Sequence, residues 1–154
     1  MLIQGLQKLK IISPFGERDR FDVKTKKMIH EFHPGVDLRV FNKAIDPDAM
    51  HIFPIIAPER IRITEVNFSQ KWGHEVRAVP FEENDFGIIE FRIWHIVPDS
   101  GCMVDAEFDP DVILGKPEAG FVLLHAHFET RIDYRGKTAI DPVPYIKSKG
   151  QEIE

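Results

Sequence analysis

Two histidines separated by a single residue, His125 and His127, are the first feature of this sequence that suggests chemistry. Side chains alternate between the two faces of a β-strand, so both imidazoles would share one face while Leu124, Ala126 and Phe128 lie on the other. The two Cα atoms would then be about 6 to 7 Å apart. At that spacing one ring can bind a metal ion while the other contacts the metal's water. A pair of half-exposed strand histidines without a ligand is the alternative interpretation.

A second pairing of possible ligands occurs much earlier in the chain, in the segment His33-Pro34-Gly35-Val36-Asp37. A helix would bring His33 and Asp37 together, but Pro34-Gly35 favours a turn followed by a strand. In that strand Asp37 points away from its apolar neighbours, and the turn can place His33 beside it. Imidazole and carboxylate groups both bind zinc. The alternative is a turn histidine next to an unrelated surface aspartate.

A third histidine, His95, lies at the end of an apolar segment, where an isolated histidine is more often a core or edge residue. Together with the other two segments it suggests a catalytic zinc site with three protein ligands and an open fourth position for water. Zinc lowers the pKa of that water and polarises a peptide carbonyl. The sequence has no His-Glu-x-x-His motif, so a histidine that does not bind the metal would act as general base. The remaining histidines lack a partner at ligand spacing and are expected on the surface or in loops: His30, His51 and His74.

The composition is that of an ordinary folded protein and excludes several functional classes. The chain has 154 residues, with 20 Lys plus Arg and 25 Asp plus Glu, and its net charge of −5 argues against a protein that mainly neutralises nucleic acid. The single cysteine, Cys102, excludes an internal disulfide and a cysteine-based zinc site. No run of about 18 apolar residues predicts a membrane span. We expect one catalytic domain over residues 1–154, acting as a monomer.

The elements that position these residues are predicted to be strands, because most segments between the prolines and glycines alternate with period two. No window predicts an amphipathic helix, apart from one or two turns in the first ten residues. The expected fold class is therefore mostly β, an antiparallel domain with little helix. The longest irregular stretches are expected at 17–42 and 97–120. Alternating acids in the second stretch fail the spacing of an EF-hand and are interpreted as a solvated loop rather than a calcium site: Asp105, Glu107, Asp109 and Asp111.

Six groups of short motifs follow one another along the chain: Ser13-Pro14-Phe15-Gly16-Glu17-Arg18, His33-Pro34-Gly35-Val36-Asp37-Leu38, Ile56-Ala57-Pro58 with Gly73-His74-Glu75-Val76, Phe91-Arg92-Ile93-Trp94-His95-Ile96, His125-Ala126-His127-Phe128-Glu129, and Asp141-Pro142-Val143-Pro144-Tyr145-Ile146. In this order they resemble the motifs of the lysostaphin-type, or LytM-type, zinc metallopeptidases, which cut peptide cross-links in bacterial peptidoglycan. Each motif alone is weak, but the ordered set covers nearly the whole chain.

The resemblance implies a role for each candidate residue. It makes His33, Asp37 and His127 the ligands of one zinc ion per chain, and it makes His125 and His95 the histidines that activate the water and stabilise the oxyanion. It also implies a compact antiparallel β-sheet domain with a substrate groove, the zinc at its floor and long loops as its walls. Such a groove fits an extended peptide stem or cross-bridge better than a folded protein.

One departure from the family concerns the groove wall. The family usually has a Gly/Ser/Thr-rich turn before its His-x-His strand, where this chain has the segment Gly115 to Leu124. This difference bears on substrate preference more than on the chemistry, and it leaves a D,D-cross-link, a glycine bridge and a stem-peptide bond as possible scissile bonds.

The function that the resemblance implies is a zinc-dependent endopeptidase acting on peptidoglycan. Because the first residues alternate too often between apolar and polar types for a signal peptide, we expect synthesis in the cytoplasm and a phage-type lysin or virion-associated enzyme, which reaches the wall through a holin, lysis or virion delivery. The alternative is a non-catalytic relative that binds cell wall or a partner protein with the same groove. A purely structural zinc is disfavoured, because three protein ligands leave one position open.

Overall fold

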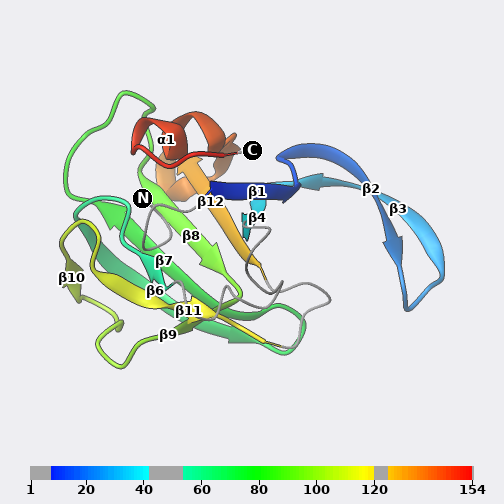
Figure 1. The fold of residues 1–154 in the computed structure, drawn as a ribbon, viewed down its shortest axis with the longest axis horizontal. Coiled ribbons are helices and arrows are strands. Elements are labelled where there is room, and N and C mark those ends of the chain that lie inside the picture. The colour runs from blue at the N-terminus through cyan, green and yellow to red at the C-terminus, as the bar shows by residue number, and fades with distance from the viewer. Residues whose placement is uncertain (1–7, 42–53, 120–124, 154) are drawn as a thin grey trace.

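The computed structural model describes residues 8–41, 54–119 and 125–153. Its largest element is an antiparallel sheet (Figure 1), whose strands lie side by side in the order β1 (Lys8–Ser13), β4 (Val36–Phe41), β12 (Ala126–Ile132), β8 (Glu90–Trp94), β7 (Gly73–Pro80), β6 (Ile61–Ser69) and β10 (Glu107–Phe108), with β13 (Thr138–Ile140) paired to β12. The expectation of a mostly β, antiparallel domain is confirmed.

Smaller elements surround this sheet. A three-stranded sheet contains β5 (Ile55–Ile56), β11 (Ile113–Pro117) and β9 (Ile96–Pro98). A two-stranded hairpin of β2 (Gly16–Asp22) and β3 (Lys27–His33) extends away from the rest of the described chain (Figure 1). After β12 come a 3-10 turn (Tyr134–Gly136), β13 and the short helix α1 (Val143–Ser148).

Strand alternation gives the large sheet one apolar face, and this face carries the core. Phe91 of β8 and Phe128 of β12 stack with ring centroids 5.9 Å apart, and Tyr145 of α1 packs with its centroid 5.2 Å from that of Phe91. Val36 and Leu38 of β4 are buried in the same cluster. The burial of these large side chains anchors β4, β8 and β12, the three strands that carry the candidate site.

The opposite face of the same strands is polar, because residues that alternate with the core residues point the other way. Antiparallel pairing places Asp37 of β4 opposite His127 of β12, and His127 opposite Trp94 of β8. One row across the sheet therefore brings together residues from three distant parts of the sequence.

Several expectations about secondary structure were wrong. Residues 17–42 form most of β2 and all of β3 in addition to β4, the strand that was expected at Asp37, and residues 97–120 include β10 and β11. β2 escaped detection because it alternates acid with base and has no fully buried residue, so it lacks the hydrophobic period of a strand. Helix α1 is too short to show a helical period, and Pro142 and Pro144 lie at its N-terminal end, where a missing N–H costs no helical hydrogen bond. In the first ten residues, Lys8 to Lys10 lie in β1 and the others are outside the described ranges.

Among the residues that the structure describes, no helix has both the length and the apolar character needed to cross a membrane. The acids interpreted as a solvated loop are partly paired at the surface, since Arg60 contacts Glu107 and Asp109, and Arg62 contacts Asp105.

Phe128 links the core to the candidate site, because its neighbours in β12 point to the polar face. Phe128→Ala should lower the free energy of unfolding by about 3 to 5 kcal/mol, through lost burial and the cavity left beside Phe91. Denaturant unfolding monitored by circular dichroism measures this. The control is Phe21→Ala, at a phenylalanine that is 56% exposed, which should change the unfolding free energy by less than about 0.5 kcal/mol. Equal effects of the two changes would contradict this assignment of the core.

Candidate functional site

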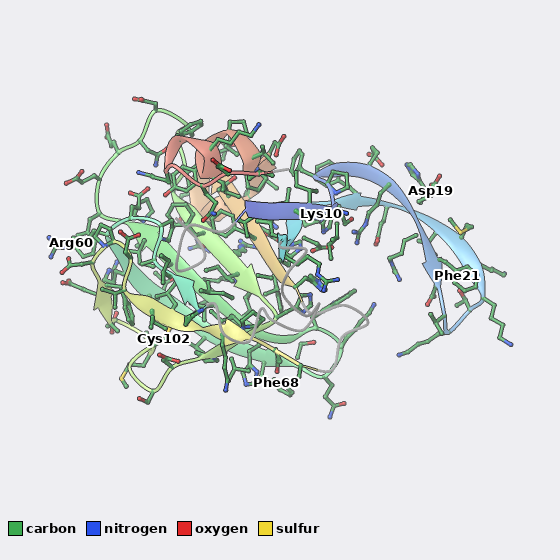
Figure 2. All side chains as sticks on the ribbon, viewed as in Figure 1. Lys10, Asp19, Phe21, Arg60, Phe68 and Cys102 are labelled. Carbon is green, nitrogen blue, oxygen red and sulfur yellow. The ribbon has the colours of Figure 1, made fainter. Side chains whose placement is uncertain are left out.

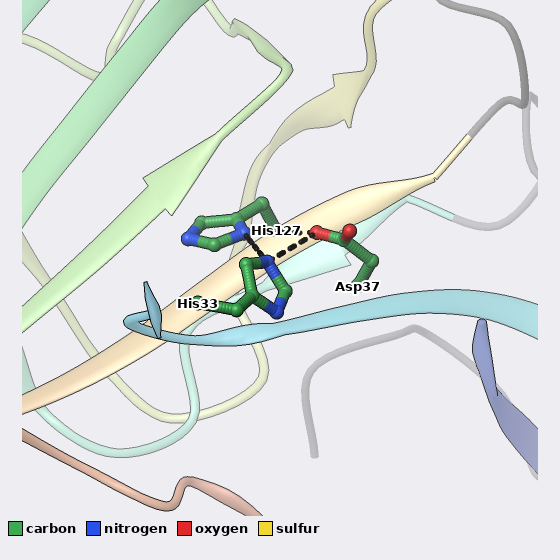
Figure 3. A group of neighbouring side chains, drawn as sticks. All are labelled: His33, Asp37 and His127. Atoms are coloured by element: carbon green, nitrogen blue, oxygen red, sulfur yellow. Dashed lines mark hydrogen bonds and ion pairs between the residues drawn. The ribbon is translucent and has the colours of Figure 1, made fainter. Parts of the chain in front are cut away.

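Three donor atoms meet on the polar face of the sheet, from His33, Asp37 and His127 (Figure 3). His127 Nδ1 lies 2.8 Å from Asp37 Oδ1 and 3.1 Å from His33 Nε2. His33 Nε2 lies 3.4 Å from Asp37 Oδ1. Both imidazoles are buried, and the carboxylate is largely so. The three residues that the sequence motifs assigned to a metal are therefore in contact.

Two local features bring these side chains together. The β4–β12 register places Asp37 beside His127, and the Pro34-Gly35 turn between β3 and β4 returns His33 to the same side, as the sequence predicted. Position 35 must be glycine because β12 passes very close to it: a Cβ there would overlap the Phe128 carbonyl oxygen and lie 2.8 Å from His127 Nε2.

The second nitrogen of each cluster imidazole has a fixed acceptor. His33 Nδ1 donates to the Pro14 carbonyl at 2.7 Å, and His127 Nε2 donates to Glu129 Oε1 at 2.9 Å. Glu129 is itself held by Arg131, whose Nε lies 2.7 Å from its Oε2. With these hydrogens placed, the atoms that face the centre of the cluster, His33 Nε2 and His127 Nδ1, are the ones able to offer a lone pair. This arrangement of outer partners is typical of metal-binding histidines.

The geometry of the cluster fits a zinc ion. Donors bound at about 2.0 to 2.1 Å in a tetrahedral site are about 3.3 Å from one another, and the three separations here are between 2.8 and 3.4 Å. Two imidazoles and one carboxylate are also a donor set that zinc accepts. Within the described ranges, this is the one group of three or more His, Cys, Asp or Glu residues arranged to hold a metal ion.

His95 and His125 lie next to the cluster. Their ring centroids are 4.7 Å apart, and His125 Nε2 is 3.8 Å from Asp37 Oδ1. His95 separates β8 from β9 and has a left-handed backbone, with φ of 63°, a strained conformation often found at functional positions.

Several hydrogen bonds hold this strained residue in place. The His95 N–H donates to the His74 carbonyl at 2.9 Å, the Glu118 N–H donates to the His95 carbonyl at 2.7 Å, and His95 Nδ1 donates to the Trp72 carbonyl at 2.8 Å. Glu118 in turn accepts from His74, from its backbone N–H at 2.8 Å and from its ring Nδ1 at 2.7 Å. Because Nδ1 of His95 donates to the Trp72 carbonyl, the lone pair of this imidazole is on Nε2.

The environment shifts the pKa values of these groups in opposite directions. Burial alone would raise the pKa of Asp37, but its close contacts with His127 and His33 outweigh burial and hold the pKa well below its usual range. Burial alone would lower the pKa of His127, but its bonds to Asp37 and Glu129 raise it to about 8. Burial, and then the neighbouring His125, lower the pKa of His95 to about 4. At neutral pH, in the absence of a metal, His127 therefore holds a second proton on Nδ1, shared with Asp37, and offers the lone pair of Nδ1 only when that proton leaves. His95 is neutral and able to accept a proton.

The cluster opens into a groove of about 580 Å³. Beside the five site residues, the groove is lined by residues of β1, the β2–β3 hairpin and its exit, the end of β8, and the β6–β7 turn, among them Arg18, Arg20, Glu31, Phe32, Trp72 and Trp94. A ligand can therefore reach the three donor atoms from one side, as a catalytic site requires.

The other predicted positions divide into three outcomes. His30 is exposed and pairs with Glu17 and Asp19, and His74 in β7 binds Glu118, so neither joins the cluster of three donor residues. His51 lies outside the described residues. The sequence did not predict that Glu129 positions His127 or that Glu118 positions His95. Glu129 could have been found, because it lies two residues after His127 and therefore on the same face of the strand. No sequence signal connects Glu118 to His95.

Comparisons with known proteins identify solved structures that share this fold. No protein-family model and no curated protein matches the sequence. The catalytic domain of the antimicrobial peptidase lysostaphin from Staphylococcus simulans aligns over 92% of this chain and 92% of its own, with a TM-score of 0.62 and 19% identity. The structure of the complex of SpoIIIAH and SpoIIQ aligns over 94% of this chain and 97% of the matched one, with a TM-score of 0.66 and 16% identity. A zinc-containing peptidase from Vibrio cholerae aligns over 91% of this chain and 37% of its own, with a TM-score of 0.58 and 14% identity. The chain therefore has the lysostaphin-type fold that the ordered motifs implied.

Replacement of Gly35 should disturb the cluster without removing any ligand. In Gly35→Ala the new methyl group displaces the His127 ring or the β12 backbone, so zinc affinity should fall by about tenfold or more. Competition with a fluorescent zinc chelator measures this. The matched control is Gly101→Ala, because a Cβ at Gly101 meets no atom within 4 Å. Equal zinc affinities of the two variants would contradict the close-packed site.

The metal-free protein should lose stability as the pH rises from about 6.5 to about 8. The pKa of His127 is higher in the folded chain than in the unfolded one, so its contribution is complete below the unfolded value and is lost as pH rises through the folded value of about 8. The full contribution is about 2 kcal/mol, of which roughly two thirds is lost in this range. Denaturant unfolding of the chelated protein across this range measures it, and His127→Gln should remove the decline. An unchanged decline in that variant would assign it to another group.

Proposed function

We propose that this protein is a zinc-dependent endopeptidase that hydrolyses peptide bonds of bacterial peptidoglycan. The observation that carries the proposal is the convergence of His33 Nε2, Asp37 Oδ1 and His127 Nδ1 within 2.8 to 3.4 Å of one another at an open groove. The ordered motifs and the fold shared with lysostaphin support a peptidase, and the zinc-containing peptidase of the same fold supports the metal.

The three clustered residues would hold the ion, and their outer partners would keep them ready for it. When bound, zinc would polarise the scissile carbonyl and make its water more acidic. Glu129 and the Pro14 carbonyl keep the N–H groups of His127 and His33 on the far side of each ring, so both rings are oriented for the metal before it binds. Zinc binding would displace the proton that His127 shares with Asp37, so zinc affinity should increase with pH up to about 8.

The two remaining histidines, His95 and His125, would accept a proton from the water and stabilise the oxyanion. His95 is neutral at physiological pH because its pKa is lowered to about 4, and its Nδ1–H is committed to the Trp72 carbonyl. His95 can therefore accept a proton at Nε2 without changing its orientation. His125, with its ring next to that of His95, would share with it the activation of water and the stabilisation of the oxyanion. General acid–base help of this kind contributes typically 10²- to 10⁴-fold in rate.

A second candidate function is a binding module that uses the same groove without cleavage. The structure of SpoIIIAH with SpoIIQ favours considering it, because that complex contains a chain with the same fold in an assembly with another protein. In that case the five site residues would contribute to recognition, and binding of cell wall or of a protein partner would survive removal of the metal.

Single substitutions should separate the metal ligands from the other histidines. His33→Ala should lose bound zinc and hydrolysis together, whereas His125→Ala should retain zinc and lose about 10²- to 10⁴-fold in the rate of cleavage. The measurements are zinc per chain by mass spectrometry and the release of new amino groups from purified peptidoglycan. Chelation should abolish cleavage by the wild-type protein, and added zinc should restore it.

His30→Ala is the matched control, because His30 is an exposed histidine bonded only to hairpin acids in the described structure, and it should retain both zinc and activity. Intact peptidoglycan after incubation with zinc-loaded wild type would refute the enzyme. Wall binding that persists under chelation, without cleavage, would instead establish the binding module.

A further inference from the structure

The β2–β3 hairpin separates its charges by face. Along β2 acid and base alternate, in Glu17, Arg18, Asp19 and Arg20, so strand geometry places the two arginines on one face and the two acids on the other. The arginines line the groove. The acids do not, and both pair with His30 at 2.8 Å; Figure 2 shows Asp19 on this projecting hairpin. The hairpin therefore presents its cationic face to the candidate metal site.

A single carboxylate oxygen serves both guanidinium groups. Glu31 Oε1 accepts from Arg18 Nε at 3.1 Å and from Arg20 Nε at 2.7 Å. Arg18 is also tied to the Ser13 hydroxyl and lies 3.6 Å from Asp37 Oδ2. The Arg20 side chain is 34% exposed, and among the described residues its ion pair is with Glu31, through Nε. The terminal nitrogens of Arg20 are therefore available to a ligand in the groove.

The other acids of the groove do not pair with Arg20. Asp37 is bonded to His127 and forms an ion pair with Arg18, and Glu129 is bonded to His127 and Arg131. The hairpin itself carries two guanidinium groups and one carboxylate, so Arg20 keeps the charge that no other groove acid offsets, and a bound metal ion would add to the positive charge of the groove. Trp72 and Trp94 supply apolar surface in the same groove. The groove is thus suited to an extended peptide that carries a negative charge.

We propose that Arg20 binds a free carboxylate of the substrate, so that the groove selects an anionic wall peptide over a glycine bridge. This proposal rests on the proposed function and names its substrate class. A guanidinium group binds a carboxylate through two parallel hydrogen bonds. A glycine bridge has no side chain to offer, so it would cover Arg20 without giving it a new partner, which costs binding free energy.

The position of Arg20 also limits where the carboxylate lies. Arg18 reaches the cluster at Asp37, and Arg20 is the next residue along the same face of β2, about 7 Å further at the level of Cα. An extended peptide covers that distance in two residues. The carboxylate should therefore belong to a residue within two positions of the scissile bond.

Two cross-linked muropeptide dimers test this, identical except that the carboxylates beside the cross-link are free in one and converted to carboxamides in the other. The zinc-loaded wild type should hydrolyse the free-carboxylate dimer with about tenfold higher kcat/KM than the carboxamide dimer, mainly through a lower KM. A difference of this size is expected from one charge-assisted hydrogen-bonded pair at a partly exposed site. Arg20→Gln should reduce this preference to nearly one. Glu31→Gln should increase it, because that change removes the carboxylate that competes for Arg20.

Arg62→Gln is the matched control, since Arg62 is an exposed arginine of β6 that does not line the groove, and it should keep the wild-type preference. Calorimetric binding of both dimers to the metal-free protein gives a second readout that needs no catalysis. If the wild type cleaves neither dimer, the proposed function fails. The calorimetric binding measurement then tests by itself whether Arg20 binds the carboxylate. Equal cleavage or equal binding of the two dimers by the wild type, or a preference unchanged in Arg20→Gln, would overturn the role of Arg20.

Discussion

The pairing of β4 with β12 is the constraint on which the rest of the site depends. It places Asp37 directly opposite His127 on the polar face of the sheet, and the same pairing places Val36 opposite Phe128 on the apolar face. A shift of one residue would bury the ligands and expose the core residues, because side chains alternate strictly along a strand. The hydrophobic core therefore protects the register that brings the donor residues of the candidate metal site together.

The cluster is also built to resist rearrangement. Each ligand imidazole has its outer nitrogen tied to an acceptor, the Pro14 carbonyl for one and Glu129 for the other. His95 is held in a left-handed conformation by backbone bonds on both sides, one to His74 and one from Glu118. Such preorganisation keeps donor atoms and proton acceptors oriented before a metal or substrate arrives, so little reorganisation is needed when they bind. The lysostaphin-type fold is shared at 14% to 19% identity with the structures compared, and identity that low leaves room for grooves with different walls.

Two segments outside the central strands act on the site of this chain. The segment that precedes the His-x-His strand contributes Glu118, which does not line the groove but fixes the backbone beside His95. The β2–β3 hairpin contributes an arginine-rich face that the alternation of acid and base along β2 directs into the groove. In the proposed function, chemistry and selectivity would be carried by different parts of the fold. The sheet would hold the reacting groups, while the projecting hairpin (Figure 1) would determine which peptide can lie across them.

The sequence by itself determined the residue types of the site and their order. The His-x-His spacing of His125 and His127, the turn before Asp37 and the period of the apolar strands are local properties, and local properties are readable from one sequence. Only the tertiary structure decided that His33, Asp37 and His127 meet within 3.4 Å, that Glu118 supports His95, and that Arg20 faces the groove. These depend on strand register and on contacts between residues far apart in the chain, which local periodicity does not encode. The same limit explains why β2 was missed, because a strand that buries no apolar face shows its period only in its charges.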